Sequence, residues 1–146
     1  MSELVTEVRT LGLDGARLVL AAAVEQAERL GVPVCIAVAD RSGHLLSFAR
    51  MDGAPLLSSE LAQNKAYSVC AFAGLPTHEW FDLIKDEPAL LHGLVKTDRL
   101  IVFGGGVPVR FGGELAGAVG VSGGTAAQDR EIAEAGARAL LARTGG

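Results

Sequence analysis

Three charged residues flanked by apolar sequence are the strongest candidates for chemistry in this chain: Arg50, Asp52 and Lys65. A charged side chain in such surroundings is usually paired, because burying it alone costs several kcal/mol. Two interpretations stay open. Asp52 forms a structural ion pair with Lys65 or Arg50, or the three side chains form the floor of a polar pocket. In the pocket, Arg50 and Lys65 would offer positive charge to an anionic or carbonyl-bearing ligand.

If that pocket is catalytic, Lys65 is the candidate acid–base or carbonyl-polarising group, and Asp52 tunes its pKa. Both residues flank the bend between a strand and a helix, so we expect them within ion-pair reach of each other. The reaction would be lyase-like or isomerase-like chemistry on a carbonyl or carboxylate substrate. A small catabolic enzyme is therefore one reading, beside a protein that only binds a ligand.

The triplet Gly104, Gly105 and Gly106 is a second candidate for ligand contact. A tight turn needs at most two glycines, so a third suggests a closely approaching ligand or an anion bound by backbone N–H groups. A purely structural role is the alternative. Arg110 would lie at the rim of the same pocket. The glycines from 117 to 123 lack the lysine of a phosphate loop and predict close packing by a helix or a neighbouring subunit instead.

The histidines and cysteines predict no metal site. His44, His78 and His92 have no compact ligand spacing, and Cys35 and Cys70 form no CxxC pair that could complete one. Two unpaired cysteines are typical of buried thiols in a reducing compartment. The cytoplasm is therefore the expected location.

Composition narrows the class of partner. The 146 residues suffice for one domain spanning 1–146, and 49% of them are apolar but only 5% aromatic. A net charge of −4 without a basic block argues against nucleic acid and anionic membrane surfaces. The apolar run at 18–24 is about a third of the length that spans a bilayer.

Periodicity and turn residues predict an α+β domain with the order helix, two strands, helices, three strands, helix. Tight turns make consecutive strands antiparallel neighbours, which gives a five-stranded antiparallel sheet flanked by helices. A Thr125–Gln128 capping box should open the last helix. Helices are expected at 11–30, 58–72, 78–84, 89–95 and 126–142, and strands at 34–39, 44–51, 100–103, 107–111 and 114–122.

Several short motifs together resemble the GlcG/HbpS-like family, which includes the C-terminal domain of PduO-type proteins. The resemblance covers nearly the whole chain. The matching pieces are Gly31-Val-Pro33, Ile36-Ala-Val-Ala-Asp40, Gly43, Arg50-Met-Asp-Gly-Ala54, Lys65-Ala66, Pro76-Thr77, Gly104-Gly-Gly106-Val-Pro108-Val109, Gly117-Ala-Val-Gly-Val-Ser-Gly123 and Asp129.

The resemblance implies a profilin-like fold and a homo-oligomer, from tetramer to octamer. It also implies a small-molecule or cofactor ligand, with haem or another tetrapyrrole as the candidate, because several members bind haem or are linked to corrinoid metabolism. Some haem-binding members use a histidine in the first helix region. This chain has no histidine before His44, so another residue would have to ligate haem. An accessory subunit of a catabolic enzyme is the remaining alternative.

Overall fold

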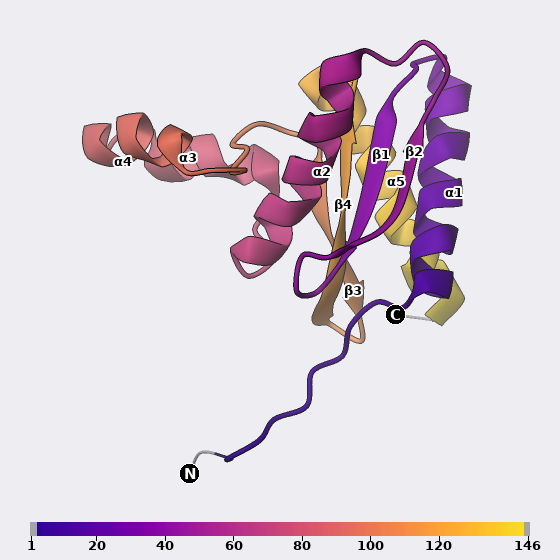
Figure 1. Ribbon diagram of the computed structural model, residues 1–146, viewed down its shortest axis with the longest axis horizontal. Helices are drawn as coiled ribbons and strands as arrows, with labels where there is room; N and C mark the ends of the chain where they lie inside the picture. The colour runs from indigo at the N-terminus through magenta and orange to yellow at the C-terminus, as the bar shows by residue number, and fades with distance from the viewer. Residues whose placement is uncertain (1–2, 145–146) are drawn as a thin grey trace.

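The computed structural model describes residues 3–144 and contains a single antiparallel sheet with helices on both faces (Figure 1). The strands are β1 (Cys35–Asp40), β2 (Leu45–Arg50), β3 (Gly106–Phe111) and β4 (Glu114–Ser122), in the order β2-β1-β4-β3. The helices are α1 (Leu13–Leu30), α2 (Leu56–Ala71), α3 (Trp80–Ile84), α4 (Pro88–Gly93) and α5 (Ala126–Thr144), with 3₁₀ turns η1 (Thr77–Glu79) and η2 (Leu94–Lys96).

The two faces of the sheet carry two separate apolar cores, because alternate side chains of a strand point to opposite faces. Ile36 and Val38 of β1 pack with α1 and α5, whereas Ala37 and Ala39 pack with α2. The apolar run of β1 is thus buried on both sides.

Small residues of the central strand β4 bring α2 very close to the sheet. A Cβ added at Gly120 would collide with the backbone oxygen of Ala62 and lie 2.6 Å from the amide nitrogen of Ala66. The predicted packing partner is therefore a helix of this same chain. The suggestion that a neighbouring subunit packs on this strand surface is wrong, because α2 already covers it.

The prediction of a fifth strand at 100–103 is also wrong: the sheet of the described residues has four strands. The segment lies against α2 and not in the sheet. The N–H of Ile101 donates to Ser68 Oγ at 2.9 Å, and that of Leu100 donates to the carbonyl of Thr97 at 3.3 Å. The two backbone N–H groups that could have paired with a neighbouring β-strand are thus bonded to a helix side chain and to a turn.

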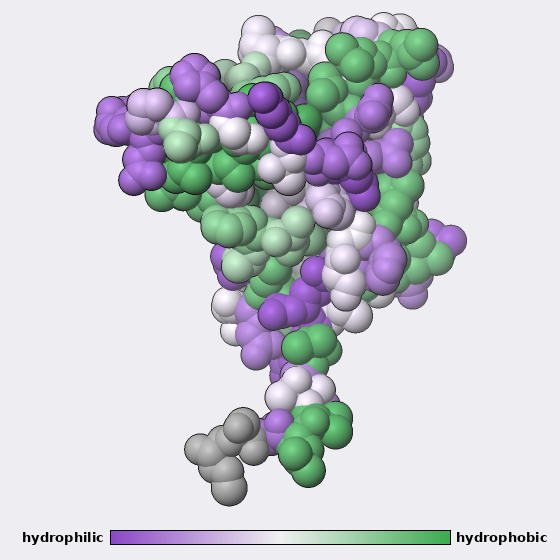
Figure 2. Space-filling view, turned by 60° about the vertical axis from the view of Figure 1, so that its left-hand side comes forward, coloured by the Kyte–Doolittle hydropathy of each residue, from purple (hydrophilic) through white to green (hydrophobic). Residues whose placement is uncertain are grey.

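An arm, residues 77–99, leaves the sheet between α2 and β3 and projects sideways from the body (Figure 1). It consists of η1, α3, α4 and η2. Trp80 and Ile84 at its base are buried, but α4 has no buried residue. Figure 2, which brings the arm forward, shows apolar and polar residues side by side on its surface. Phe81, Leu83 and Val95 expose 54%, 60% and 55% of their surface.

Candidate functional site

Lys65 is a buried charged residue, which lies on α2 with 1% of its surface exposed. Its Nζ donates to the carbonyl of Val121 at 2.8 Å and to Asp129 Oδ2 at 3.2 Å. Asp129 belongs to the first turn of α5 and also accepts the N–H of Gly124 at 2.9 Å through Oδ1. The pair therefore fastens the helix of one sheet face to a helix of the other.

The glycine triplet forms the cover over this pair. Gly105 has φ +130°, and a Cβ there would lie 2.6 Å from Lys65 Nζ. A Cβ on Gly106 would lie 2.7 Å from the carbonyl oxygen of Lys65. Phe103 closes the other side, with its ring centroid 5.2 Å from the ammonium, a favourable cation–π distance. The close approach that the triplet predicts is thus made by Lys65, a contact that favours the structural role.

Burial dominates the electrostatics of Lys65. Desolvation lowers the pKa of its ammonium, and the charge and hydrogen bond of Asp129 oppose that shift. A lysine with a lowered pKa is a common feature of active sites, but structural ion pairs show it as well. The geometry around Nζ favours the structural role, because the Val121 carbonyl, Asp129 and the ring of Phe103 surround it.

The predicted pair of Lys65 with Asp52 does not form, and that expectation is wrong. Asp52 lies in an exposed turn after β2 and makes no ion pair with a residue of 3–144. Arg50, at the exposed end of β2, donates from Nη2 to the carbonyl of Ala54 at 2.8 Å. The partner of Lys65 comes instead from the far end of the chain, a contact that sequence spacing could not reveal.

Arg110 lies apart from Lys65, on the exposed end of the edge strand β3. A Cβ on Gly74 would lie 3.1 Å from one of its Nη atoms. The guanidinium borders an open hollow of about 600 Å³ together with Phe72 and Pro76. The structure therefore does not bring Arg110, Arg50 and Lys65 into one pocket.

A cleft that the sequence did not suggest lies where the chain enters α1. It has a volume of about 540 Å³, within the range of small-molecule sites. At its mouth the guanidinium of Arg9 lies 5.1 Å from the ring centroid of Phe111. The signal in the sequence is a pair of closely spaced glycines, Gly12 and Gly15, at the start of a helix. The cleft is lined by Arg9, Thr10, Leu11, Gly12, Gly15, Phe111, Ala116 and Leu140.

The histidines lie outside that cleft. His44 is exposed and its Nδ1 lies 3.3 Å from Asp40 Oδ2. His78 has a buried Nδ1 without a hydrogen-bond partner among the described residues. Burial lowers the pKa of His78, and Arg130 adds to that shift against Glu79 and Glu134. No group of three or more His, Cys, Asp or Glu side chains within 3–144 could hold a metal ion.

The family of this chain follows from its sequence matches. Residues 11–138 match the family described as "Haem degrading protein HbpS-like", and the chain belongs to it. It is 41% identical over 130 residues to a 15.0 kDa protein of the dhaT-dhaS intergenic region of Citrobacter freundii, covering 88% of this chain and 90% of that one. Protein GlcG of Escherichia coli is 37% identical over 107 residues, covering 73% and 77%.

Solved structures agree with the fold. The ORFY protein of Klebsiella pneumoniae superposes with a TM-score of 0.89 at 37% identity, over 97% of this chain and 98% of that one. A structure described as a PduOC:Heme complex superposes with a TM-score of 0.80 at 36% identity, over 89% and 94%. The resemblance to GlcG, HbpS and PduO-type domains is confirmed.

Proposed function

We propose that this protein binds a small molecule in the cleft at the start of α1, and that a tetrapyrrole is the candidate ligand. The observation that carries the proposal is the composition of the cleft. An apolar floor of Leu11, Ala116 and Leu140 suits a hydrophobic ring system, and the guanidinium of Arg9 suits a carboxylate at its edge. The related PduOC structure, which contains haem, supports the same ligand class.

The cleft fits the ring system better than it fits an axially ligated iron. No histidine, cysteine, methionine or tyrosine is among the cleft residues that the structure describes. The hydroxyl of Thr10 already accepts the N–H of Arg41 at 3.1 Å. His78 lines a different cavity with Arg130 and Glu134. We therefore derive no chemistry through iron and assign the residues only a binding role.

Titration with haemin and with metal-free protoporphyrin IX tests the proposal. Without an axial imidazole, both should bind with similar affinity, and haemin should give a broad Soret band. Arg9→Gln and Gly15→Leu, which remove the charge and fill the cleft, should weaken both ligands. The control variants His44→Ala, His78→Ala and His92→Ala should leave binding unchanged.

Two outcomes would overturn this proposal. One is a sharp stoichiometric Soret transition lost in a histidine variant, which would identify an imidazole ligand. The other is that neither porphyrin binds, or that both bind the Gly15→Leu variant as well as the original protein.

A catabolic enzyme that uses Lys65 stays the second candidate, because burial gives this lysine the lowered pKa of many catalytic amines. Such an enzyme would have to open the 103–106 segment to admit a substrate. In that case Lys65→Met would abolish turnover, while Asp52→Asn, at a residue that forms no ion pair with Lys65, would not.

We also propose an oligomeric state and a cellular location. We expect a cytoplasmic homo-oligomer, and a partner enzyme docked on the arm would fit the accessory-subunit alternative. Within residues 3–144, each helix is too short or too polar to cross a membrane.

A further inference from the structure

Arg99, where the arm returns to the body, has a backbone conformation that few residues adopt. Its φ is +65°, in the left-handed region that favours glycine. Ser68 on α2 holds this turn: its Oγ lies 3.0 Å from the carbonyl of Arg99 and accepts the N–H of Ile101 at 2.9 Å. Strained residues of this kind persist where surrounding contacts fix them, and they concentrate at binding sites.

The side chain of Arg99 also contacts α2. The guanidinium carbon lies 4.0 Å from the ring centroid of Tyr67, and Nε donates to Asn64 Oδ1 at 2.9 Å. These contacts orient the planar group but leave its two Nη groups without an ion pair to any residue in 3–144. A fixed guanidinium with free Nη donors is the form that binds carboxylates bidentately.

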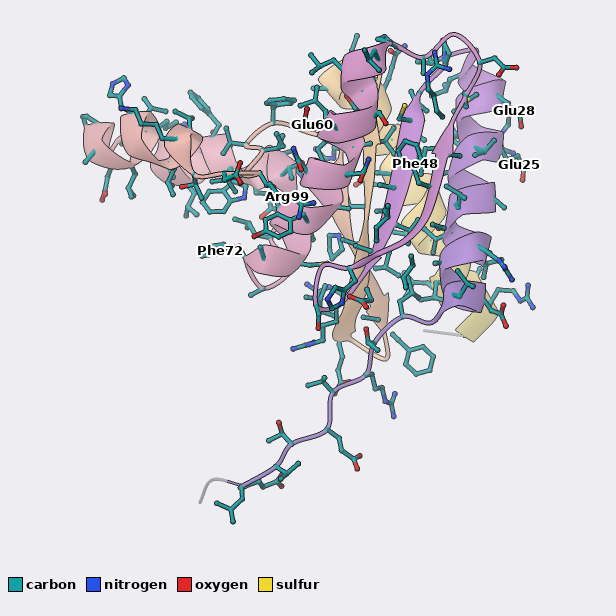
Figure 3. The ribbon with its side chains drawn as sticks, viewed as in Figure 1. Glu25, Glu28, Phe48, Glu60, Phe72 and Arg99 are labelled. Atoms are coloured by element: carbon teal, nitrogen blue, oxygen red, sulfur yellow. The ribbon has the colours of Figure 1, made fainter. Side chains whose placement is uncertain are left out.

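Arg99 borders an open hollow of about 600 Å³ along the outer side of α2. Figure 3 shows Glu60 and Arg99 on the side of α2 that faces the arm. Leu56 and Leu57, in the first turn of α2, expose 86% and 64% of their surface beside it. The lining thus combines an oriented cation, two apolar side chains, and the polar side chains of Ser59, Glu60, Gln63 and Asn64.

We propose that this hollow is a second ligand site, which binds a small organic carboxylate. The carboxylate would pair with the Nη groups of Arg99, and an apolar part of the ligand would cover Leu56 and Leu57. The free carboxylate of Glu60 disfavours a second negative charge, so a neutral or cationic substituent should face it. The site lies on the α2 face of the sheet, opposite the α1 cleft, and is independent of the tetrapyrrole proposal.

Benzoate and benzamide are matched probes, because they differ in charge and share the apolar ring. We expect benzoate to shift the backbone ¹H–¹⁵N resonances of residues 56–64 and 99 at millimolar concentrations, and benzamide to shift them much less. Arg99→Gly should weaken benzoate binding by about tenfold or more. Glycine accepts the positive φ, so this variant should fold at least as well as the original.

Two further variants sharpen the test. Glu60→Gln should tighten benzoate binding, because it removes a repelling charge from the same hollow. Arg29→Gln, an exposed arginine on α1, should leave binding unchanged. The proposal is overturned if benzamide binds equally well, if Arg99→Gly retains full affinity, or if the shifts map elsewhere. It is also overturned if chemical cross-linking or hydrogen exchange shows that a second copy of the chain already covers these residues.

Discussion

The ammonium of Lys65 and the carboxylate of Asp129 lie 3.2 Å apart in the interior and join α2 to α5 across the sheet. The second carboxylate oxygen holds the N–H of Gly124, so the same group also fixes the turn before α5. Side-chain exposures of 1% and 4% exclude water from the pair. Removing either partner would therefore leave a buried charge without compensation.

Lys65→Met should destabilise the fold by about 3–5 kcal/mol, because it leaves Asp129 charged and buried without its partner. Asp129→Asn should cost less, since an amide oxygen can still accept the N–H of Gly124. The double variant with both substitutions should be less destabilised than the sum of the two single variants. Urea denaturation of the four proteins measures this coupling, and simple additivity would show that the pair does not interact.

Gly105→Ala should destabilise the protein by about 2–4 kcal/mol, because it combines a positive φ with a Cβ that meets Lys65 Nζ. Gly93→Ala is the matched control. A Cβ there would meet nothing within 4 Å, and the backbone of Gly93 has a φ of −87°. Thermal unfolding measures the melting temperatures of the two variants. Equal melting temperatures would contradict the packing described for the triplet.

Cys70 should make stability fall at alkaline pH. Burial, aided by Asp40 and opposed by Arg41, raises the pKa of its thiol to about 12. The unfolded chain loses this proton near pH 8.5, at about the ordinary cysteine value. Between that pH and about 12 the folded state holds the extra proton, so stability declines as pH rises.

Urea denaturation at pH 8 to 11 measures this decline, and Cys70→Ala should make it shallower. Burial also raises the pKa of Cys35, so some slope should remain in that variant. An unchanged slope would mean that Cys70 ionises as readily in the folded state as in the unfolded state.

Phe81 and Leu83 should lie in the subunit interface of the expected oligomer, because α3 exposes them on the projecting arm. We expect light scattering to give a multiple of the 15.0 kDa chain mass. Phe81→Asp and Leu83→Asp should reduce it toward the monomer. Val5→Asp, at an exposed apolar position in the N-terminal segment, is the control. A monomer at micromolar concentration would contradict this prediction.

The sequence predicts most of the fold because its signals are local. The capping box is confirmed by paired bonds of 3.0 and 3.1 Å between Thr125 and Gln128. The last helix forms where it is expected, and its residues Ile132 and Ala133 are fully buried. The prediction of a fifth strand was wrong because residues 100–103 are as apolar as a strand. The N–H of Ile101 instead donates to Ser68, which is far away in sequence.

The site was harder to predict because its contacts are long-range. Sequence reasoning singled out Lys65 and the glycine triplet correctly as neighbours in one constellation. It paired Lys65 with the nearer Asp52, although only the folded topology brings Asp129 to it. Arg99 escaped notice because an exposed arginine carries no signal until its φ and its stacking on Tyr67 are known.

A side-chain hydroxyl binds the backbone at each end of the arm. Thr77 Oγ1 accepts the N–H of Gly106 at 2.8 Å, and Ser68 holds the backbone at Arg99 and Ile101. Neither core of the sheet contains a residue of the segment between these anchors, whose own buried apolar side chains are Trp80 and Ile84. The length and sequence of the intervening helices can therefore vary without changing the packing on either face of the sheet, provided that both anchors and these two side chains are kept.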